Sequence, residues 1–240
     1  MTLTVLQLSD IHFGPSPNSL VSGHHPEDRL ATVVAAWLAT GQNADLVVLT
    51  GDITDEGTPE AYDRVVTALR PLDTAIMAIS GNHDDDAEVA RAFGGAHVAE
   101  LENWRIVGLN SARPDLVNGI IDVDDVCALL DAVDDRPTVL AIHHPPRSRS
   151  TGSYFKLDGD TELLEALAAR PHVRAVISGH LHDAFEFTGA NGLELLGGPS
   201  TLMAIRHEGE SFVVGVDAPT GGRVLHLADD GTVTSSLLLA

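Results

Sequence analysis

Five strand-length apolar runs, each followed at once by a short motif of potential metal ligands, constrain this chain more than any other feature. The runs cover residues 3–8, 46–50, 75–80, 139–142 and 173–178. The motifs that follow them are Asp10-Ile11-His12, Gly51-Asp52, Gly81-Asn82-His83-Asp84, His143-His144-Pro145-Pro146 and Gly179-His180-Leu181-His182. Because α/β proteins place their active sites just past the carboxyl ends of strands, this order predicts that the motifs form one site.

Helix-like patterns alternate with these strands up to about residue 180. We expect helices over residues 26–40, 59–70, 85–93, 122–133 and 160–170, with Thr58 as a hydroxyl cap before Pro59. Beyond about residue 185 we expect short strands over residues 193–196, 211–216, 223–228 and 233–239, with a hairpin turn at 229–231. The pattern predicts one α/β domain over residues 1–240, in which helices flank the sheets and the C-terminal part is rich in strands.

Composition excludes several classes of protein. The chain has 240 residues, a net charge of −21 and a sequence pI near 4.6. That charge repels the nucleic-acid backbone, so we expect no nucleic-acid polymer as a partner. No basic or apolar leader precedes the first strand and no window is long enough to span a bilayer, so we expect neither a signal peptide nor a membrane partner. The single Cys127 favours a cytoplasmic, reducing location.

The motifs supply oxygen and nitrogen ligands but no thiolate. The candidate ligands are Asp10, His12, Asp52, Asn82, His143, His180 and His182. This donor set suits manganese, iron, zinc or cobalt, and excludes a Cys-rich structural zinc site or an all-oxygen calcium site. Asp52 lies in the middle of the set and is the candidate bridge between two ions. Two divalent ions with two carboxylates and a hydroxide would carry a charge of about +1, which attracts a phosphate.

With these motifs the chain resembles the calcineurin-like metallophosphoesterases over nearly its whole length. It is most similar to the class III cyclic-nucleotide phosphodiesterases and the related bacterial glycerophosphodiesterases. The likeness also covers residues 51–57 with Tyr62, Asn110-Ser111, Gly198-Pro199-Ser200-Thr201 and the tail at 219–231. It implies a four-layer αββα sandwich of two mixed β-sheets flanked by helices. Glu56 stands where the Ser/Thr protein phosphatases of this superfamily carry an Arg.

The resemblance implies two metal sites that share one carboxylate. The first would use Asp10, His12, Asp52 and His182, and the second would use Asp52, Asn82, His143 and His180. The implied reaction is the hydrolysis of small phosphodiesters, cyclic nucleotides first, by a metal-bridging hydroxide. Three alternatives stay open: a broad phosphomonoesterase, a glycerophosphodiesterase, and a metal-bound scaffold without catalytic activity. Relatives assemble as dimers or larger oligomers, so a homo-oligomer is a further possibility.

His83 follows a ligand without being counted as one, so we expect it to face the phosphate. There it would stabilise developing charge or protonate the leaving alkoxide. Asp84 is expected either to hold the tautomer of His83 or to be an acid at a helix start. His144 and Arg147 are candidate substrate contacts, with hydrogen bonding to a ligand as an alternative for His144. The loops at 13–25 and 145–159 are expected at the rim of the site.

Overall fold

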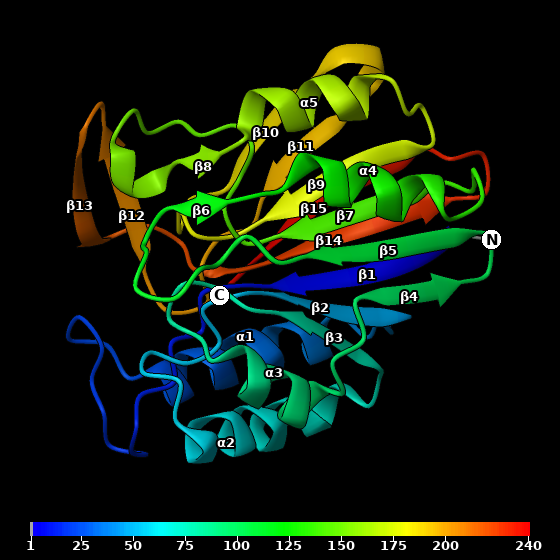
Figure 1. Cartoon of the computed structure of the whole chain (residues 1–240). Coiled ribbons are helices and arrows are strands. Elements are labelled where there is room, and N and C mark those ends of the chain that lie inside the picture. Colours follow the sequence, from blue (N-terminus) through cyan, green and yellow to red (C-terminus); the bar gives the residue numbers. More distant parts are fainter. Residues whose placement is uncertain (1) are drawn as a thin grey trace.

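Two mixed β-sheets pack face to face in the computed structural model, which describes residues 2–240 (Figure 1). The first sheet has the order β15-β14-β1-β2-β3, in which β1, β2 and β3 are parallel and the other two pairings are antiparallel. Its strands are β1 (Thr2–Leu8), β2 (Leu46–Thr50), β3 (Ile76–Ile79), β14 (Gly221–Ala228) and β15 (Val233–Leu239).

The second sheet has the order β10-β11-β9-β7-β5-β4, with four parallel inner strands and an antiparallel strand at each edge. Its strands are β4 (Val98–Leu101), β5 (Trp104–Leu109), β7 (Thr138–Ile142), β9 (Val173–Ser178), β10 (Phe185–Thr188) and β11 (Glu194–Gly197). Two small pairs complete the strands: β6 (Gly119–Ile120) with β8 (Leu157–Asp158), and the hairpin of β12 (Ala204–Glu208) and β13 (Ser211–Val216).

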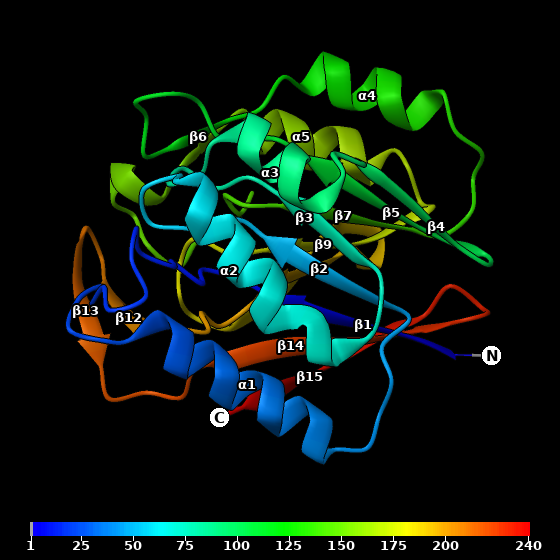
Figure 2. The same cartoon turned by 90° about the horizontal axis from the view of Figure 1, so that it is seen from below.

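Helices cover the outer face of each sheet (Figures 1 and 2). The first sheet is covered by α1 (Pro26–Ala39), α2 (Pro59–Leu69) and α3 (Asp86–Phe93), and the second by α4 (Val123–Asp131) and α5 (Asp160–Ala168). Short 3₁₀ turns are η1 (Arg70–Leu72), η2 (Ser153–Phe155) and η3 (Ala190–Gly192). The four-layer αββα arrangement implied by the resemblance is confirmed.

Alternation along β1 shows how the layers are held. Val5 packs between the sheets with Ile106, whereas Leu6 packs under the helices with Leu30. Strands buried on both faces need apolar residues at successive positions, which is why the sequence shows runs rather than alternation. Each buried side chain of this kind contributes about 1.5–3 kcal/mol of transfer free energy.

The predicted elements are present, with small shifts and additions. All five helices form, and Asp85 and Asp122 cap α3 and α4 with their carboxylates. The hydroxyl cap expected at Thr58 is wrong, because its side chain makes no hydrogen bond to the helix end. Strands β4, β5, β6, β8, β10 and β12 lie outside the expected strand ranges. In β10 and β12, charged and polar residues interrupt the apolar pattern. Among residues 2–240, no helix is long and apolar enough to cross a membrane.

Candidate metal centre

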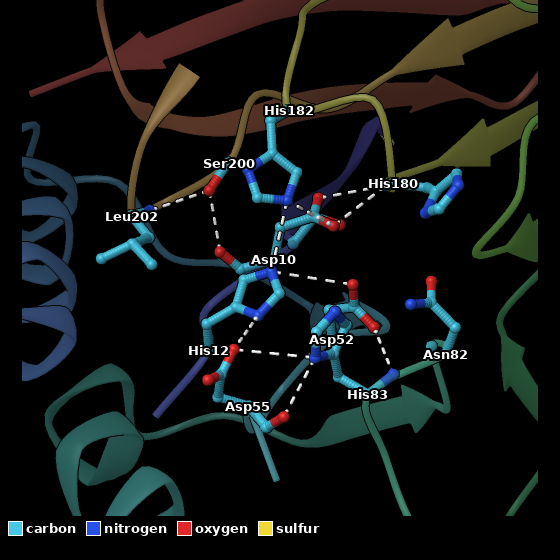
Figure 3. A network of polar contacts seen from close by, with 12 residues as sticks. Asp10, His12, Asp52, Asp55, Asn82, His83, His180, His182, Ser200 and Leu202 are labelled. Atoms are coloured by element: carbon cyan, nitrogen blue, oxygen red, sulfur yellow. Dashed lines mark hydrogen bonds and ion pairs between the residues drawn. The ribbon is translucent and has the colours of Figure 1, made fainter. Parts of the chain in front are cut away.

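The five motifs meet at one end of the sandwich. Strands β1, β2 and β3 of the first sheet and β7 and β9 of the second all end there, so the residues that follow them are neighbours (Figure 1). A hydrogen bond from Nδ1 of His143 to the carbonyl of Thr50, 2.8 Å long, joins the two sheets at this edge. Figure 3 shows side chains from both sheets pointing toward Asp52.

Five of the candidate ligands have a left-handed backbone conformation. The φ angle is positive, between 47° and 67°, at Asp10, His12, Asp52, His180 and His182. Such a conformation costs on the order of 1–3 kcal/mol at a residue with a Cβ and persists only where the surroundings fix it. Here it is fixed by short bonds, including the amide of His180 to Asp10 Oδ1 at 3.0 Å and the amide of His12 to the Asp52 carbonyl at 2.9 Å. Strain gathered at one set of polar residues indicates a functional site.

The first group of donors is formed by Asp10, His12, Asp52 and His182, all buried and with donor atoms within 4.8 Å of one another. Nε2 of His182 lies 3.4 Å from Asp10 Oδ1, and Nε2 of His12 lies 3.6 Å from Asp52 Oδ2. These are the residues expected at the first metal site, and the structure brings them together.

The tautomers of His12 and His182 suit the binding of a cation. Nδ1 of His12 lies 3.1 Å from the carboxylate of Asp55, and Nδ1 of His182 lies 3.0 Å from the carbonyl oxygen of Met203. Both partners are acceptors, so Nδ1 carries a proton in each ring and Nε2 is the nitrogen that can bind a metal. The two Nε2 atoms face each other at 3.2 Å. Two ring nitrogens at that distance need a proton or a metal ion between them, and a bound metal would be held by both.

The second group also gathers potential ligand atoms. Because Nδ1 of His143 donates to Thr50, Nε2 is the nitrogen that can bind a metal once its proton is lost. That atom lies 3.2 Å from Asn82 Oδ1 and 3.4 Å from Asp52 Oδ2, which are both acceptors. His180 completes the group, with Nε2 bonded to the Tyr154 carbonyl at 3.2 Å and Nδ1 left free. Asp52 lies between the two groups and can serve both.

In the metal-free protein, burial and nearby charges shift the pKa values of the histidine rings in different directions. Burial lowers the pKa of His182 to about 4 and that of His180 well below its usual value. Burial acts in the same direction on His143, but the carboxylate of Asp52 outweighs it and raises the pKa to about 9. His180 and His182 are therefore neutral and ready to bind a metal at pH 7, whereas His143 must first lose a proton.

His83 stands over this site with one ring nitrogen free. Its amide donates to Asp52 Oδ1 at 3.0 Å, and its Nδ1 donates to the main-chain oxygen of Asp55 at 2.9 Å (Figure 3). The side chain is 34 % exposed, and its ring lies edge-on to that of His12 with centroids 4.8 Å apart. Nε2 is therefore free to meet a ligand at the metal centre.

Asp84 does not hold the tautomer of His83, because Asp55 does. The carboxylate of Asp84 accepts hydrogen bonds from the amides of Gly81, Ile53 and Thr54 and from the hydroxyl of Tyr62, at 2.9–3.1 Å. These bonds tie the loop after β3 to the loop after β2. Asp84 fixes the positions of Asn82 and His83 and does not itself reach the reacting groups.

The cavity over the candidate ligands is not lined by His144 or Arg147, the predicted substrate contacts. His144 is completely buried, and its ring nitrogens contact Ser111 Oγ at 2.8 Å and the Val117 carbonyl at 2.9 Å. Burial lowers its pKa to about 3, so the ring stays neutral. Arg147 places its guanidinium 4.5 Å above the ring of Phe187, outside the cavity over the metal ligands. Neither side chain is positioned to touch a substrate at the metal centre.

Several groups that build the site were not predicted as site residues. Asp55 and the carbonyls of Met203 and Tyr154 orient ligand histidines. The hydroxyl of Ser200 donates to the carbonyl of Asp10 at 2.8 Å and accepts from the amide of Leu202 at 2.9 Å (Figure 3). Asp55 and Ser200 stood in segments that carry the resemblance, which was the only signal for them. A main-chain carbonyl leaves no signal in the sequence.

Comparison with known proteins agrees with this site. The family model described as calcineurin-like phosphoesterase matches residues 3–184. A probable cyclic nucleotide phosphodiesterase of Synechococcus sp. is 31 % identical over 250 residues, covering 99 % of this chain and 92 % of its own. The 3′,5′-cyclic adenosine monophosphate phosphodiesterase CpdA of Pseudomonas aeruginosa is 28 % identical over 98 % of this chain and 89 % of its own. The chain belongs to the calcineurin-like phosphoesterase family.

Solved structures show the same fold at much lower sequence identity. A dimetal phosphatase from Danio rerio aligns with a TM-score of 0.67 and 14 % identity, over 99 % of this chain and 98 % of that one. A purple acid phosphatase from yellow lupin aligns with a TM-score of 0.70 and 14 % identity, over 99 % of this chain and 52 % of that one. At such identities the likeness concerns the fold alone.

Proposed function

We propose that this protein is a metal-dependent phosphodiesterase that uses two metal ions to hydrolyse small diesters, with cyclic nucleotides as its substrates. The observation that carries the proposal is the convergence of ligand atoms on either side of Asp52. Nε2 of His12 faces Nε2 of His182 at 3.2 Å, and Nε2 of His143 faces Asn82 Oδ1 at 3.2 Å. Both relatives described above are named as cyclic nucleotide phosphodiesterases, which supports the substrate class.

The ligands would hold the two ions as two sets that share Asp52. Asp10, His12 and His182 would complete the first set, and Asn82, His143 and His180 the second. When bound, manganese, iron, zinc or cobalt ions would lower the pKa of the attacking water and neutralise charge on the phosphate. The ring of His83, held through Nδ1, would present Nε2–H to a phosphate oxygen or to the leaving alkoxide.

Charge favours a diester over a monoester. A diester carries one negative charge, which matches a site of about +1, whereas a monoester dianion is repelled further by the acidic protein. The chain has a net charge of −21, and Glu56 is exposed close to the site. A broad phosphomonoesterase and a glycerophosphodiesterase are the alternatives within the enzyme class.

A substrate panel tests this function directly. The protein, loaded in turn with manganese, zinc, iron and cobalt, is assayed on 3′,5′- and 2′,3′-cyclic nucleotides, bis(p-nitrophenyl) phosphate, glycerophosphodiesters and p-nitrophenyl phosphate. We expect higher kcat/KM for the diesters, cyclic nucleotides included. Monoesters turned over about tenfold faster under every metal would replace the diesterase with the monoesterase. No turnover of any ester by metal-loaded protein would favour the scaffold.

The number of ions is tested separately through Asn82. The Asn82→Ala variant removes a neutral ligand of the second set only, so elemental analysis should show metal content falling toward one ion per chain. Asn118→Ala, which removes a surface amide bonded to Asp158, is the matched control and should keep the full content. Full occupancy in Asn82→Ala would remove Asn82 from the ligands. The cytoplasmic location and the homo-oligomer stay predictions.

A further inference from the structure

The cavity over the candidate metal ligands has a polar wall and an apolar wall. Its volume is about 180 Å³, and the polar wall consists of five candidate ligands, His12, Asp52, Asn82, His180 and His182, with Asp55 and His83. The apolar wall includes Tyr154, Phe155, Ile205, Phe212 and Val214, from η2 and from the β12–β13 hairpin. Inorganic phosphate would need only the polar wall. The apolar wall therefore indicates that the ligand carries an apolar or aromatic group beside its phosphate.

Two aromatic side chains of this wall, Tyr154 and Phe212, are exposed, although the chain is poor in aromatic residues. Tyr154 is 42 % exposed and Phe212 is 39 % exposed, with ring centroids 5.5 Å apart. Both tryptophans, by contrast, are buried in the core at 1–2 % exposure. Exposing two large rings at the mouth of a polar site costs hydrophobic free energy unless a ligand covers them.

Tyr154 is fixed relative to the metal ligands. Its carbonyl accepts the hydrogen bond from Nε2 of His180 at 3.2 Å, and its ring lies nearly parallel to that of His180, with centroids 5.9 Å apart. Phe155, which is buried, supports Phe212 edge-on at 5.1 Å. The hairpin is joined to the loop before η2 by the bond from the Thr151 amide to the Gly209 carbonyl, 3.0 Å long. A group stacked on these rings would hold a defined position relative to the ions.

The cavity on the other side of His83 offers no such surface. Its volume is about 480 Å³, and carboxylates of Glu56, Asp85, Asp86 and Asp115 line it, with Arg113 as its one cation. Apart from the imidazole of His83, none of the side chains that line it is aromatic. A nucleobase would find two aromatic rings on the Tyr154 side, whereas the Arg113 side offers one guanidinium among carboxylates.

We infer that Tyr154 and Phe212 form a stacking surface for the nucleobase of the substrate, and that this surface selects cyclic nucleotides from other small diesters. The inference rests on the proposed function, since it assumes that the phosphate is bound at the metal centre. Stacking of a base on an aromatic side chain contributes enough for roughly a 5- to 100-fold preference. Stacking recognises the flat face of a base, so purines should be preferred to the smaller pyrimidines.

The test compares cyclic AMP with methyl riboside 3′,5′-cyclic phosphate, which has the same ring phosphate and no base. In Tyr154→Ala and Phe212→Ala the ratio of kcat/KM for cyclic AMP to that for the base-free ester should fall roughly 5- to 100-fold, mainly through KM. Tyr154→Phe keeps the ring and should keep the ratio. Val213→Ala is the matched control, because Val213 is 42 % exposed on the same strand and does not line the cavity. An unchanged ratio in both alanine variants would overturn the inference.

A binding measurement separates failure of this inference from failure of the proposed function. The fluorescence of 2-aminopurine riboside 3′,5′-cyclic phosphate is quenched when the base stacks on an aromatic ring, whether or not the ester is hydrolysed. Quenching by the metal-loaded protein should be lost in Tyr154→Ala and kept in Val213→Ala. If the protein hydrolyses no cyclic nucleotide yet quenches in this pattern, the activity is wrong and the stacking surface stands. Absence of quenching by the unmodified protein would overturn the stacking surface.

Discussion

The carboxylate of Asp55 lies 3.1 Å from Nδ1 of His12, on the side of the ring away from the candidate ligands. Because it accepts the Nδ1 proton, it leaves the Nε2 lone pair for a metal. The main-chain oxygen of the same residue accepts a bond from His83 at 2.9 Å. One residue therefore orients a ligand through its side chain and the candidate acid through its backbone.

Asp55→Asn should weaken metal binding at the first site by about 10- to 100-fold, the usual effect of losing the partner of a ligand histidine. His83 keeps its 2.9 Å hydrogen bond to the main chain of residue 55 and loses only the charge of the carboxylate oxygen 3.6 Å away. Metal titration of the chelated protein measures the loss, and activity should recover when metal is added in excess. Glu56→Gln removes the same charge one residue later and should leave the affinity unchanged. Lost activity at saturating metal would mean that Asp55 does more than orient His12.

Metal uptake should rise with pH and release protons. In the metal-free protein, burial opposes protonation of His143 but Asp52 raises its pKa to about 9, against an ordinary value of 6.5. The ring therefore carries a proton at pH 7.5, and a metal must displace it. Calorimetry in two buffers of different ionisation enthalpy should detect more protons released per chain at pH 7.5 than near pH 9.5. Equal release at both pH values would contradict the raised pKa.

Protonation of His143 also makes the stability of the chelated protein depend on pH. A pKa raised in the folded state contributes stability that is fully present below pH 6.5 and is lost as the pH rises through 9. The free energy of unfolding of chelated protein should therefore contain a falling contribution between pH 6.5 and 9. His143→Ala, which lacks the group, should not show that contribution.

Asp84→Ala should destabilise the fold and reduce activity only through the loops it joins. The change leaves the buried donors of Gly81, Ile53 and Tyr62 without an acceptor, which costs on the order of 3 kcal/mol or more. For a chain of this length, thermal unfolding should shift down by roughly 6–12 °C. Asp86→Asn, an exposed change that keeps an acceptor oxygen, should shift it little. A wild-type melting temperature in Asp84→Ala would show that these bonds contribute nothing to stability.

The candidate ligands could be named from the sequence because each carries its signal locally. A polar metal-binding side chain directly after a buried strand is visible in the chain, and the topology of parallel strands brings such residues together. In the pair His143-His144, only the resemblance assigned His143 as the ligand, because both residues have the same chemistry. The structure separates them: His143 faces Asp52, while His144 is turned to Ser111 and Val117.

Other parts of the site depend on contacts between distant residues. Asp84 adjoins His83 in sequence, but the turn after β3 points its carboxylate to the amides of the loop after β2. Tyr154 and Phe212 lie far apart in the sequence, so their contact could not be predicted from it. The β12–β13 hairpin places Phe212 beside Tyr154. Strand β12 itself was not expected, since Arg206 and His207 interrupt its apolar pattern.

His83→Ala should slow turnover by roughly 10²–10⁴-fold while metal content and folding stay intact. The ring lies outside both ligand sets, and its free Nε2 is the group placed to donate a proton or a hydrogen bond to the substrate. The loss should be smaller for bis(p-nitrophenyl) phosphate than for a cyclic nucleotide, because a nitrophenolate leaves without a proton and an alkoxide needs one. His97→Ala, an exposed histidine away from the metal centre, is the matched control and should keep full activity with both substrates. An equal loss for aryl and alkyl esters would exclude proton donation and assign His83 to charge stabilisation alone.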